Sequence, residues 1–346
     1  MVKPEKIELT AQEAAQFWDD LRKEADAVHR SERVFRLGEM TLRIIFHEKR
    51  IEEYALGQLK TALLPQGSGA ELTVHCLVSD ALWRRCGQLP DEHRACLWCG
   101  ERRMLFNLDW DPSSFYGSDG QEVWLGWREL GEDLPRRLGH FFFRHFARML
   151  RERKTYMLHG GCVGTEGKGI LLCGKGGSGK STVSAACLLS GMDYVAEDYL
   201  LLKKTAAGYL AWPTYSTLNL TEEMLEKMPV FADHDTGYRG WNGKHFIDLS
   251  PWKEQFRYAF PLTGVLLPVI TDRQEPCITP TEPAAPMAQL IWSTVRQTDS
   301  LFNSALIKEM SDLLRGLPTY KMELCPDVYK NAEALRRFIA QQPVIL

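Results

Sequence analysis

The sequence predicts an α/β protein in which a smaller, β-rich α+β module precedes a mixed-sheet core. Two observations favour this class. Before residue 150, most apolar runs alternate with polar residues, which is the pattern of half-buried strands. After residue 150, apolar strand-like runs alternate with helical periods, and one run leads through a glycine-rich loop into a helix. We therefore expect one domain at residues 1–150 and a second at 151–346.

Length and charge restrict the classes of protein that this chain represents. With 346 residues, 45% hydrophobic and 25% charged, it has the composition of a globular protein with a sizeable core. A net charge of -3 provides no overall field to hold a polyanion, so we expect no nucleic-acid partner. No apolar run approaches the roughly 20 residues that span a bilayer, so we expect no membrane association.

The first domain is expected to begin with an amphipathic helix at 9–33, with Thr10 as its N-cap. Strands should follow, and residues 109–120, which are rich in turn formers, should form a long loop. A helix at 134–154 then presents one aromatic and aliphatic face, which we expect to pack on a sheet rather than on a membrane or nucleic acid. The predicted strands of this part are residues 34–47, 70–78, 97–108 and 122–127.

The second domain is expected to alternate strands and helices. A helix at 181–190 should end at Gly191, a residue suited to a helix C-cap, and one helix should span 287–314. The final elements should be a strand at 319–323 and a helix at 329–341. The other predicted strands are residues 156–163, 169–173, 194–202 and 264–270.

Residues 174–181 read GKGGSGKS and match the pattern of a phosphate-binding loop. The loop lies between an apolar strand (GILLC) and a helix, which is the context that this pattern requires. Glycines allow a tight bend whose backbone N–H groups point at phosphate oxygens, and the helix N-terminus adds positive potential. Lys180 should reach the β and γ phosphates, and the Ser181 hydroxyl should bind Mg²⁺. The nucleotide-binding residues are predicted to be Gly174, Lys175, Gly176, Gly177, Ser178, Gly179, Lys180, Ser181 and Thr182.

An adjacent acidic pair, Glu197 and Asp198, interrupts an otherwise apolar strand after the loop helix. Two neighbouring carboxylates inside such a strand are costly without a cation. Phosphoryl transfer needs a carboxylate at Mg²⁺ and often a second one to accept the proton of the acceptor hydroxyl. His159, at the end of the strand-like run before the loop, would lie near the phosphates if that run and residues 169–173 form a hairpin.

Residues 158–202, LHGGCVGTEGKGILLCGKGGSGKSTVSAACLLSGMDYVAEDYLLL, resemble the catalytic core of the HPr kinase/phosphorylase-related P-loop kinases. Weaker similarity continues through GKHFIDL, PLTGVLLP and LPTYKMELCPDV, so it covers roughly the last 200 residues. The resemblance implies a fold like that of phosphoenolpyruvate carboxykinase and phosphorylation of a hydroxyl. It also implies a catalytic role for His159, and it makes Asp198 the carboxylate at the metal and Glu197 the general base.

The sequence departs from this family at two points. The base is usually Asp, and the additional methylene of Glu197 moves a proton acceptor by about an ångström. The second glycine-rich segment of true HPr kinases is absent, so we do not expect HPr as the substrate. Lys244, where relatives often carry a basic residue, is a weaker candidate for a contact with phosphate or acceptor, and a solvated loop lysine explains it equally well. Arg296, in a predicted helix, is a candidate for a contact with the nucleotide, but an exposed helical arginine is the preferred interpretation.

Nine cysteines are an odd number, scattered without the spacing of a disulfide framework, and we expect reduced thiols in a cytoplasm. The spacing of Cys96 and Cys99, with Cys86 and His93 nearby, resembles half of a zinc knuckle. A second pair at standard distance is missing, so ordinary core cysteines are the preferred interpretation.

The predicted function is that of an ATP-dependent kinase, with Mg²⁺, that phosphorylates a hydroxyl on a peptide, a protein or a small molecule. Two alternatives stay open. One is a metabolite kinase of the shikimate-kinase type, although such chains usually begin with the phosphate loop. The other is a nucleotide-binding sensor or scaffold with weak catalysis. A homo-oligomer also stays open.

Overall fold

The computed structural model describes residues 5–26, 28, 30–80, 95–100, 102–108, 111–119, 122–131, 139–151, 153–240, 242–298 and 304–342. The chain divides into two compact units. Unit 1 comprises residues 1–57 and 62–134, and unit 2 comprises residues 58–61 and 135–346. Residues 135–150, which the sequence placed in the N-terminal domain, therefore lie in unit 2.

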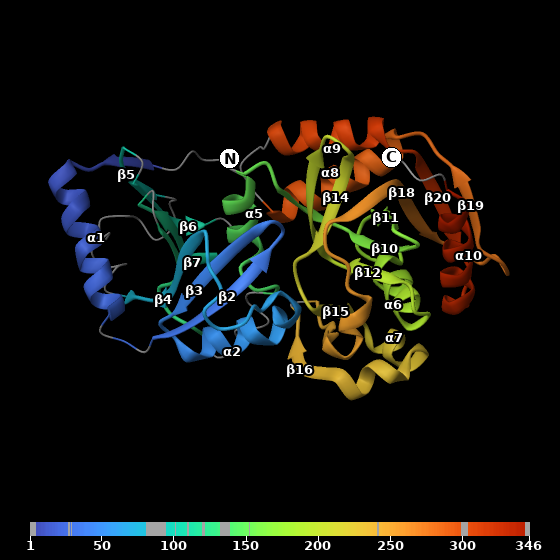
Figure 1. The fold of residues 1–346 in the computed structure, drawn as a ribbon, viewed down its shortest axis with the longest axis horizontal. Coiled ribbons are helices and arrows are strands. Elements are labelled where there is room, and N and C mark those ends of the chain that lie inside the picture. The colour runs from blue at the N-terminus through green and yellow to red at the C-terminus, as the bar shows by residue number, and fades with distance from the viewer. Residues whose placement is uncertain are drawn as a thin grey trace. The chain divides into compact units, whose positions relative to one another are not determined.

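Unit 1 is built on a mixed sheet of eight described strands in the order β1-β5-β6-β7-β8-β4-β3-β2 (Figure 1). The helix α1 packs on it through Trp18 and Leu21, which join Phe115 and Trp124 in one apolar core. The bounds are β1 Glu5–Glu8, α1 Ala11–Asp26, β2 Ser31–Leu37, β3 Met40–Phe46, α2 Lys49–Gln58, β4 Leu72–Val78, β5 Ala95–Cys99, β6 Arg102–Leu108, β7 Asp111–Ser118 and β8 Glu122–Trp127.

Two predictions for unit 1 were wrong in detail. Residues 111–118 form strand β7 instead of part of a loop, because they pair with β6 and β8 on both sides. Residues 34–47 are not one strand: they contain the end of β2, a turn and the whole of β3, and β2 and β3 form a hairpin. The turn between them contains Gly38, whose φ of 65° is in the left-handed region that glycine adopts readily.

Unit 2 contains a mixed sheet of nine described strands, in which β12-β10-β11-β18-β14-β13-β9 follow one another and β20 joins both β18 and β19. A second, three-stranded sheet has the order β15-β17-β16. The strands are β9 Tyr156–His159, β10 Gly161–Thr165, β11 Lys168–Leu172, β12 Asp193–Ala196, β13 Tyr199–Thr205, β14 Gly208–Pro213, β15 Thr217–Leu220, β16 Asp235–Arg239, β17 His245–Asp248, β18 Phe260–Ile270, β19 Cys277–Pro280 and β20 Thr319–Leu324.

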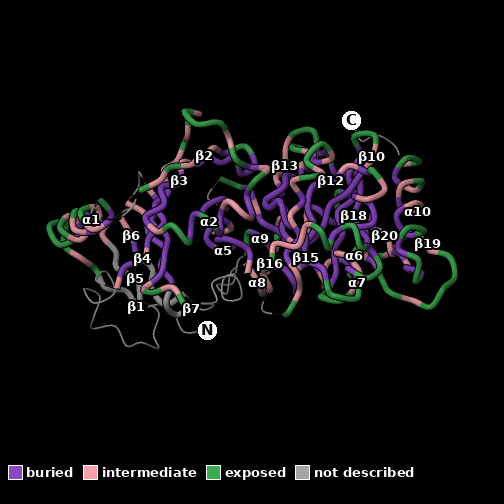
Figure 2. The backbone as a smooth tube through the Cα atoms, turned by 90° about the horizontal axis from the view of Figure 1, so that it is seen from below, coloured by how far each residue is buried: buried purple, intermediate pink, exposed green. Residues whose placement is uncertain are grey.

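Helices cover both faces of the large sheet of unit 2. Apolar residues of α6 and α10 join one core cluster with the sheet, and residues of α8 and α9 join another. Figure 2 shows buried stretches of chain running along the strands, with exposed stretches in the turns between them. The mixed α/β class predicted from the sequence is confirmed. The helices are α5 Phe143–Arg151, α6 Lys180–Leu189, α7 Glu222–Lys227, α8 Ala284–Thr298, α9 Ser304–Gly316 and α10 Val328–Gln341.

The helix predictions for unit 2 were confirmed only in part. The structure places α6 where residues 181–190 were expected, and Gly191 follows it with a φ of 76°. The helix expected at 287–314 is two helices, α8 and α9. The helix expected at 134–154 begins only at Phe143 within the described residues, because Gly139 and Phe142 both have positive φ values that a right-handed helix excludes. Among the described residues, no helix is long and apolar enough to cross a bilayer.

Candidate active site

The glycine-rich loop connects β11 to α6, and its shape depends on three glycines. Gly174, Gly177 and Gly179 have φ values of 150°, 79° and 98°. These values favour glycine because a Cβ atom makes the left-handed region costly. A Cβ on Gly179 would also lie 2.5 Å from Leu324 Cδ1. The sequence pattern is therefore reproduced as a tight bend with the N-terminus of α6 at its end.

Lys180 is the first residue of α6, and its side chain turns back beneath the loop. Its Nζ donates hydrogen bonds to the carbonyl oxygens of Gly174 at 2.6 Å and Lys175 at 3.2 Å. Burial lowers the pKa of Lys180, although Asp198 and Glu197 act in the opposite direction. A buried cation thus lies inside the bend, near two carboxylates.

Glu197 and Asp198 lie between two strands and not within the single strand predicted at 194–202. β12 ends at Ala196 and pairs with β10, whereas β13 begins at Tyr199 and pairs with β9 and β14. The chain changes partners at this point, so neither acid belongs to a ladder. The run predicted as one strand at 156–163 is also interrupted, between the end of β9 and the start of β10. At this interruption the Gly160 N–H donates to the Asp198 carbonyl at 2.9 Å.

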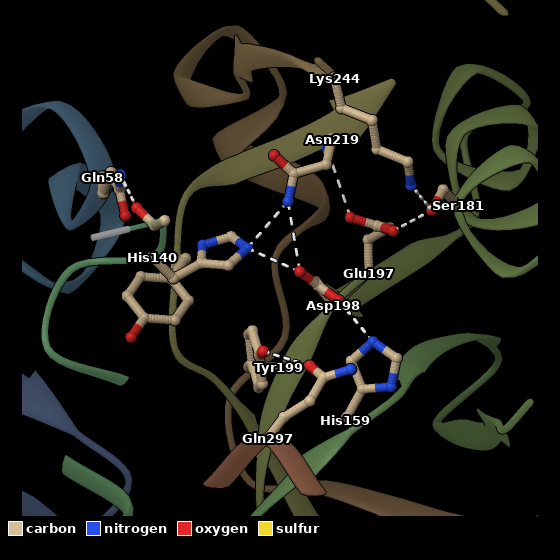
Figure 3. Close-up of polar contacts among 12 residues, drawn as sticks. Gln58, His140, His159, Ser181, Glu197, Asp198, Tyr199, Asn219, Lys244 and Gln297 are labelled. Atoms are coloured by element: carbon tan, nitrogen blue, oxygen red, sulfur yellow. Dashed lines mark hydrogen bonds and ion pairs between the residues drawn. The ribbon is translucent and has the colours of Figure 1, made fainter. Parts of the chain in front are cut away.

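Glu197 faces the loop helix. Ser181 Oγ donates a hydrogen bond to Glu197 Oε1, and the Asn219 N–H donates to Oε2 at 3.2 Å (Figure 3). Lys244 Nζ lies 3.4 Å from the same Ser181 hydroxyl. Burial raises the pKa of Glu197 and the charge of Asp198 adds to the rise, while Lys244, Ser181 and Asn219 partly offset it.

Asp198 lies between two imidazoles, as Figure 3 shows. Its Oδ1 is 2.8 Å from His159 Nε2, and its Oδ2 is 2.9 Å from His140 Nε2. Asn219 Nδ2 is 3.3 Å from Oδ2. Burial acts to raise the pKa of Asp198, but its hydrogen bonds with His140 and His159 outweigh burial and hold that pKa well below its usual value. The carboxylate is accordingly ionised.

His140 and Asn219 are site residues that the sequence analysis did not identify. His140 precedes α5, in a segment interpreted only as an amphipathic helix, and Asn219 lies in β15. Gln58 holds the His140 segment from both sides. Its Oε1 accepts a bond from the Phe141 N–H at 2.8 Å, and its Nε2 donates to the Gly139 carbonyl at 3.1 Å. Neither residue belongs to a local motif, so no spacing pointed to them.

The loop, both acids and both histidines line one cavity of about 780 Å³ in unit 2. Lys244 and Asn219 also line it, as do Trp292 and Ile270, whose side chains are largely exposed. The cavity therefore brings together most of the residues that the sequence selected. The predicted loop residues on its wall are Lys175, Gly176, Gly177, Ser178, Gly179, Lys180, Ser181 and Thr182.

Two predicted loop residues do not contribute to the acidic centre, and the side chains of some other candidates lie outside the described residues. Gly174 shapes the loop without lining the cavity, and the Thr182 hydroxyl donates to Met224 Sδ at 3.2 Å, away from the acids. Arg296 lies in α8, and its side chain is outside the described residues, as are the side chains of Cys86, His93 and Cys96. Cys99 is partly exposed. Within the described residues, no group of three His, Cys, Asp or Glu side chains is arranged to hold a metal ion.

The fold and the site define an α/β protein with mixed sheets and a glycine-rich loop beside two carboxylates. No family model matches the chain, and no curated protein matches it. Among solved structures, it is similar to the HPr(Ser) kinase/phosphatase from Coxiella burnetii, with 14% identity and a TM-score of 0.29. The likeness covers 53% of this chain and 96% of that chain. At this level it establishes neither family nor function.

Proposed function

We propose that this protein is an ATP-dependent phosphotransferase with a hydroxyl group as acceptor. The observation that carries the proposal is the contact between Ser181 and Glu197, because it joins the first turn of the loop helix to the acidic pair. A loop of this sequence binds triphosphates, and carboxylates beside its serine are what phosphoryl transfer requires. The resemblance found in the sequence supports the same reaction.

The nucleotide phosphates are proposed to bind along residues 174–182. Backbone N–H groups of the bend and the N-terminus of α6, a helix of ten residues, provide donors and positive potential. Lys180 and Lys244 add two cations on the same side of the cavity. The negative charge of the triphosphate would be met mainly by these groups.

The residues of the site fit Mg²⁺. Mg²⁺ prefers oxygen ligands and is usually bound through one or two protein oxygens together with substrate phosphates and water. Ser181 and Glu197 offer a hydroxyl and a carboxylate next to each other. Asp198 is the carboxylate to which the resemblance in the sequence assigned the metal. When bound, Mg²⁺ neutralises charge on the transferred group.

The acceptor is proposed to be a hydroxyl of a peptide, a protein or a small molecule, entering the part of the cavity beyond the acidic pair. The walls there come from the His140 segment, α5 and α8, and include Phe143, Tyr199 and Gln297. Together with Arg144, which lines the same part of the cavity, these side chains offer aromatic, amide and guanidinium groups to an acceptor. A cytoplasmic location and activity as a homo-oligomer remain proposals from the sequence.

The test is binding and transfer with the full chain and Lys180→Ala. Calorimetry with Mg-ATP should show that the substitution weakens binding by about 100-fold or more, since it removes a buried charge that contacts phosphate. Lys253→Ala, at an exposed lysine of the 3₁₀ segment Ser250–Gln255, is the matched control and should bind as the wild type does.

Incubation of both proteins with labelled ATP and cell extract then identifies the acceptor. Label on a protein or peptide supports the proposal in its first form, and label on a metabolite supports the metabolite-kinase alternative. Binding of Mg-ATP without any labelled product supports a nucleotide sensor. Unchanged affinity in Lys180→Ala would contradict the placement of the phosphates.

A further inference from the structure

We propose that Arg144 binds a carboxylate of the acceptor, so that the acceptor is a molecule whose hydroxyl lies close to a carboxylate group. This inference rests on the proposed phosphotransferase function and names the class of acceptor for the same site. A free peptide C-terminus, an acidic side chain beside the acceptor residue and a small hydroxy acid share this chemistry. The carboxylate is bound and not transferred, so it takes no part in the reaction itself.

The cationic side chains that line the cavity fall into two groups. Among the described residues they are three lysines and one arginine. Lys175 and Lys180 belong to the glycine-rich loop, and Lys244 Nζ lies 3.4 Å from Ser181 Oγ, so these three lie beside the proposed phosphates. Arg144 belongs to the first turn of α5, on the wall proposed for the acceptor. Its charge is therefore placed to meet the acceptor and not the triphosphate.

Two contacts hold the guanidinium group of Arg144. Its Nε donates a hydrogen bond to the Gln297 carbonyl oxygen at 2.6 Å, near the end of α8. Its Cζ lies 4.4 Å from the centroid of the Phe143 ring. An arginine that is held in this way loses little conformational freedom when it binds a ligand. The planar fork of N–H donors matches the two oxygens of a carboxylate.

The same wall connects Arg144 to the acidic pair. The Phe143 ring stacks on Tyr199, with 4.8 Å between ring centroids, and Tyr199 directly follows Asp198 in the chain. The Tyr199 hydroxyl donates to Gln297 Oε1 (Figure 3). Burial and Asp198 raise the pKa of Tyr199 and Arg144 acts in the opposite direction, so both charges lie near this ring. An acceptor along this wall presents its hydroxyl to the acidic pair and a neighbouring group to Arg144.

The charge of this part of the cavity favours a carboxylate over a more highly charged group. The ionised Asp198 has two imidazoles and Asn219 as hydrogen-bond partners and does not require Arg144. A phosphate monoester carries about −1.5 to −2 charges at pH 7. Part of that charge would face Asp198 uncompensated. A carboxylate carries a single negative charge, which one guanidinium balances.

Matched acceptors test the carboxylate directly. The full chain is incubated with γ-labelled Mg-ATP and pairs of probes. One pair is a serine tripeptide with a free C-terminus or a C-terminal amide, another is a capped peptide with Asp or Asn beside its serine, and the third is glycerate or glycerol. We expect kcat/KM to be at least about tenfold higher for the member with the carboxylate in the pair that resembles the natural acceptor. The pair that responds identifies the source of the carboxylate.

Arg144→Gln should raise the KM of the carboxylate acceptor by about 10- to 100-fold, because it removes a charge-assisted hydrogen bond. We expect kcat, the affinity for Mg-ATP and ATP hydrolysis with water to stay within about threefold of wild type, and the KM of the neutral acceptor to be unchanged. Arg144→Lys keeps the charge without the planar fork and should give an intermediate KM. Arg148→Gln is the matched control, since Arg148 lies in the same helix without lining the cavity.

Cell extract covers acceptors that the probes do not represent. The carboxylates of the extract are blocked by amidation with methylamine and a carbodiimide, and the full chain is then added with labelled ATP. We expect blocking to remove the label from the acceptor, whereas mock-treated extract is labelled. With untreated extract, Arg144→Gln should label the acceptor at about a tenth of the wild-type rate or less, and Arg148→Gln should label it at the wild-type rate.

Two results would overturn the inference and leave the proposed function intact. One is an acceptor that is phosphorylated equally well after its carboxylates are amidated. The other is an unchanged acceptor KM in Arg144→Gln, which would show, together with a lower free energy of unfolding in urea, that Arg144 only joins α5 to α8. A wild-type protein that transfers phosphate to no probe and to no component of the extract removes both the proposed function and this inference.

Discussion

Gly176 and Gly179 belong to the same loop, yet they differ in what a methyl group would meet. A Cβ on Gly176 has nothing within 4 Å, whereas one on Gly179 collides with Leu324 at a left-handed φ of 98°. We expect Gly179→Ala to lower the free energy of unfolding by about 1–3 kcal/mol and to weaken ATP binding. Gly176→Ala is the control and should change neither by much. Urea unfolding and calorimetry measure both, and equal effects of the two substitutions would contradict the loop geometry.

The two carboxylates should affect stability with opposite signs. The raised pKa of Glu197 means that its ionised form destabilises the fold above that pKa, so Glu197→Gln should increase the free energy of unfolding at pH 7. The depressed pKa of Asp198 means that its ionised form stabilises the fold, so Asp198→Asn should decrease it.

The pH windows of these effects also differ. The increase in the free energy of unfolding caused by Glu197→Gln should fade as the pH falls through the raised pKa of Glu197. The decrease in the free energy of unfolding caused by Asp198→Asn should persist down to about pH 4, the usual pKa of Asp, and should fade only below that pH. Urea unfolding of the three proteins from pH 7 to pH 4 measures this. A deficit in Asp198→Asn that disappears before the gain in Glu197→Gln would contradict the assigned directions.

At the scale of residues, the sequence predicted the part of the site that a local pattern encodes. The loop could be predicted because the eight consecutive residues 174–181 carry the pattern. His140 and Asn219 could not be read in this way. Each comes from a distant segment and reaches Asp198 only through the pairing of strands and the hydrogen bonds of Gln58.

Lys168, at the start of β11, links the large sheet to the last helix. Its buried Nζ donates to the carbonyl oxygens of Ala340 at 2.9 Å and Gln342 at 2.8 Å, at the end of α10. Lys168→Met should lower the free energy of unfolding by about 1–3 kcal/mol, because it leaves two helix-end carbonyls without this donor. Exchange of the amide hydrogens in the last turn of α10 should also accelerate.

The control for this prediction is Lys253→Met, at an exposed lysine, which should leave stability within about 0.5 kcal/mol of wild type. Hydrogen exchange with mass spectrometry follows the last turn of α10 directly. If exchange there is unchanged in Lys168→Met, the ammonium group does not stabilise the helix end.

At the scale of elements, periodicity predicted the existence of strands and helices better than their interruptions. The runs 156–163 and 194–202 each became two strands, because each changes its pairing partner midway. Apolar sequence continues through both changes, so the hydrophobic pattern shows no gap. β7 was missed for a different reason, since its serines, glycine and proline are typical of turns and only pairing on both sides makes it a strand.

Gln58 connects distant parts of the chain within unit 2. It is 1% exposed, it bonds the main chain on both sides of His140, and its carbonyl accepts from the Ser216 N–H at 2.7 Å. Gln58→Ala should lower the free energy of unfolding by about 1–3 kcal/mol, because it leaves the buried Phe141 N–H unsatisfied. It should also reduce turnover more than ATP affinity, since it loosens His140 and not the loop.

Gln66→Ala, at an exposed glutamine, is the matched control and should behave like the wild type. Steady-state hydrolysis and calorimetry of the two variants separate turnover from affinity. An equal loss of affinity and turnover in Gln58→Ala would show that Gln58 supports the whole unit and not the His140 segment in particular.

At the scale of the molecule, the class could be predicted and the division of the chain only roughly. Alternating strands and a loop–helix unit indicated a mixed α/β protein, and this is what the structure contains. The domain boundary was predicted at residue 150 because the spacing of apolar residues changes near that position. The structure assigns residues 135–150 and the short segment 58–61 to unit 2, a discontinuity that no sequence period reveals.

The discontinuity at residues 58–61 matters to anyone who dissects the gene. A fragment starting at residue 135 retains the glycine-rich loop and both acids, but it lacks Gln58, whose amide bonds the main chain on either side of His140. Such a fragment could bind nucleotide and still be inert. Inactivity of this fragment would reflect the loss of Gln58 and not a defect in the nucleotide site, so functional tests should use the full chain.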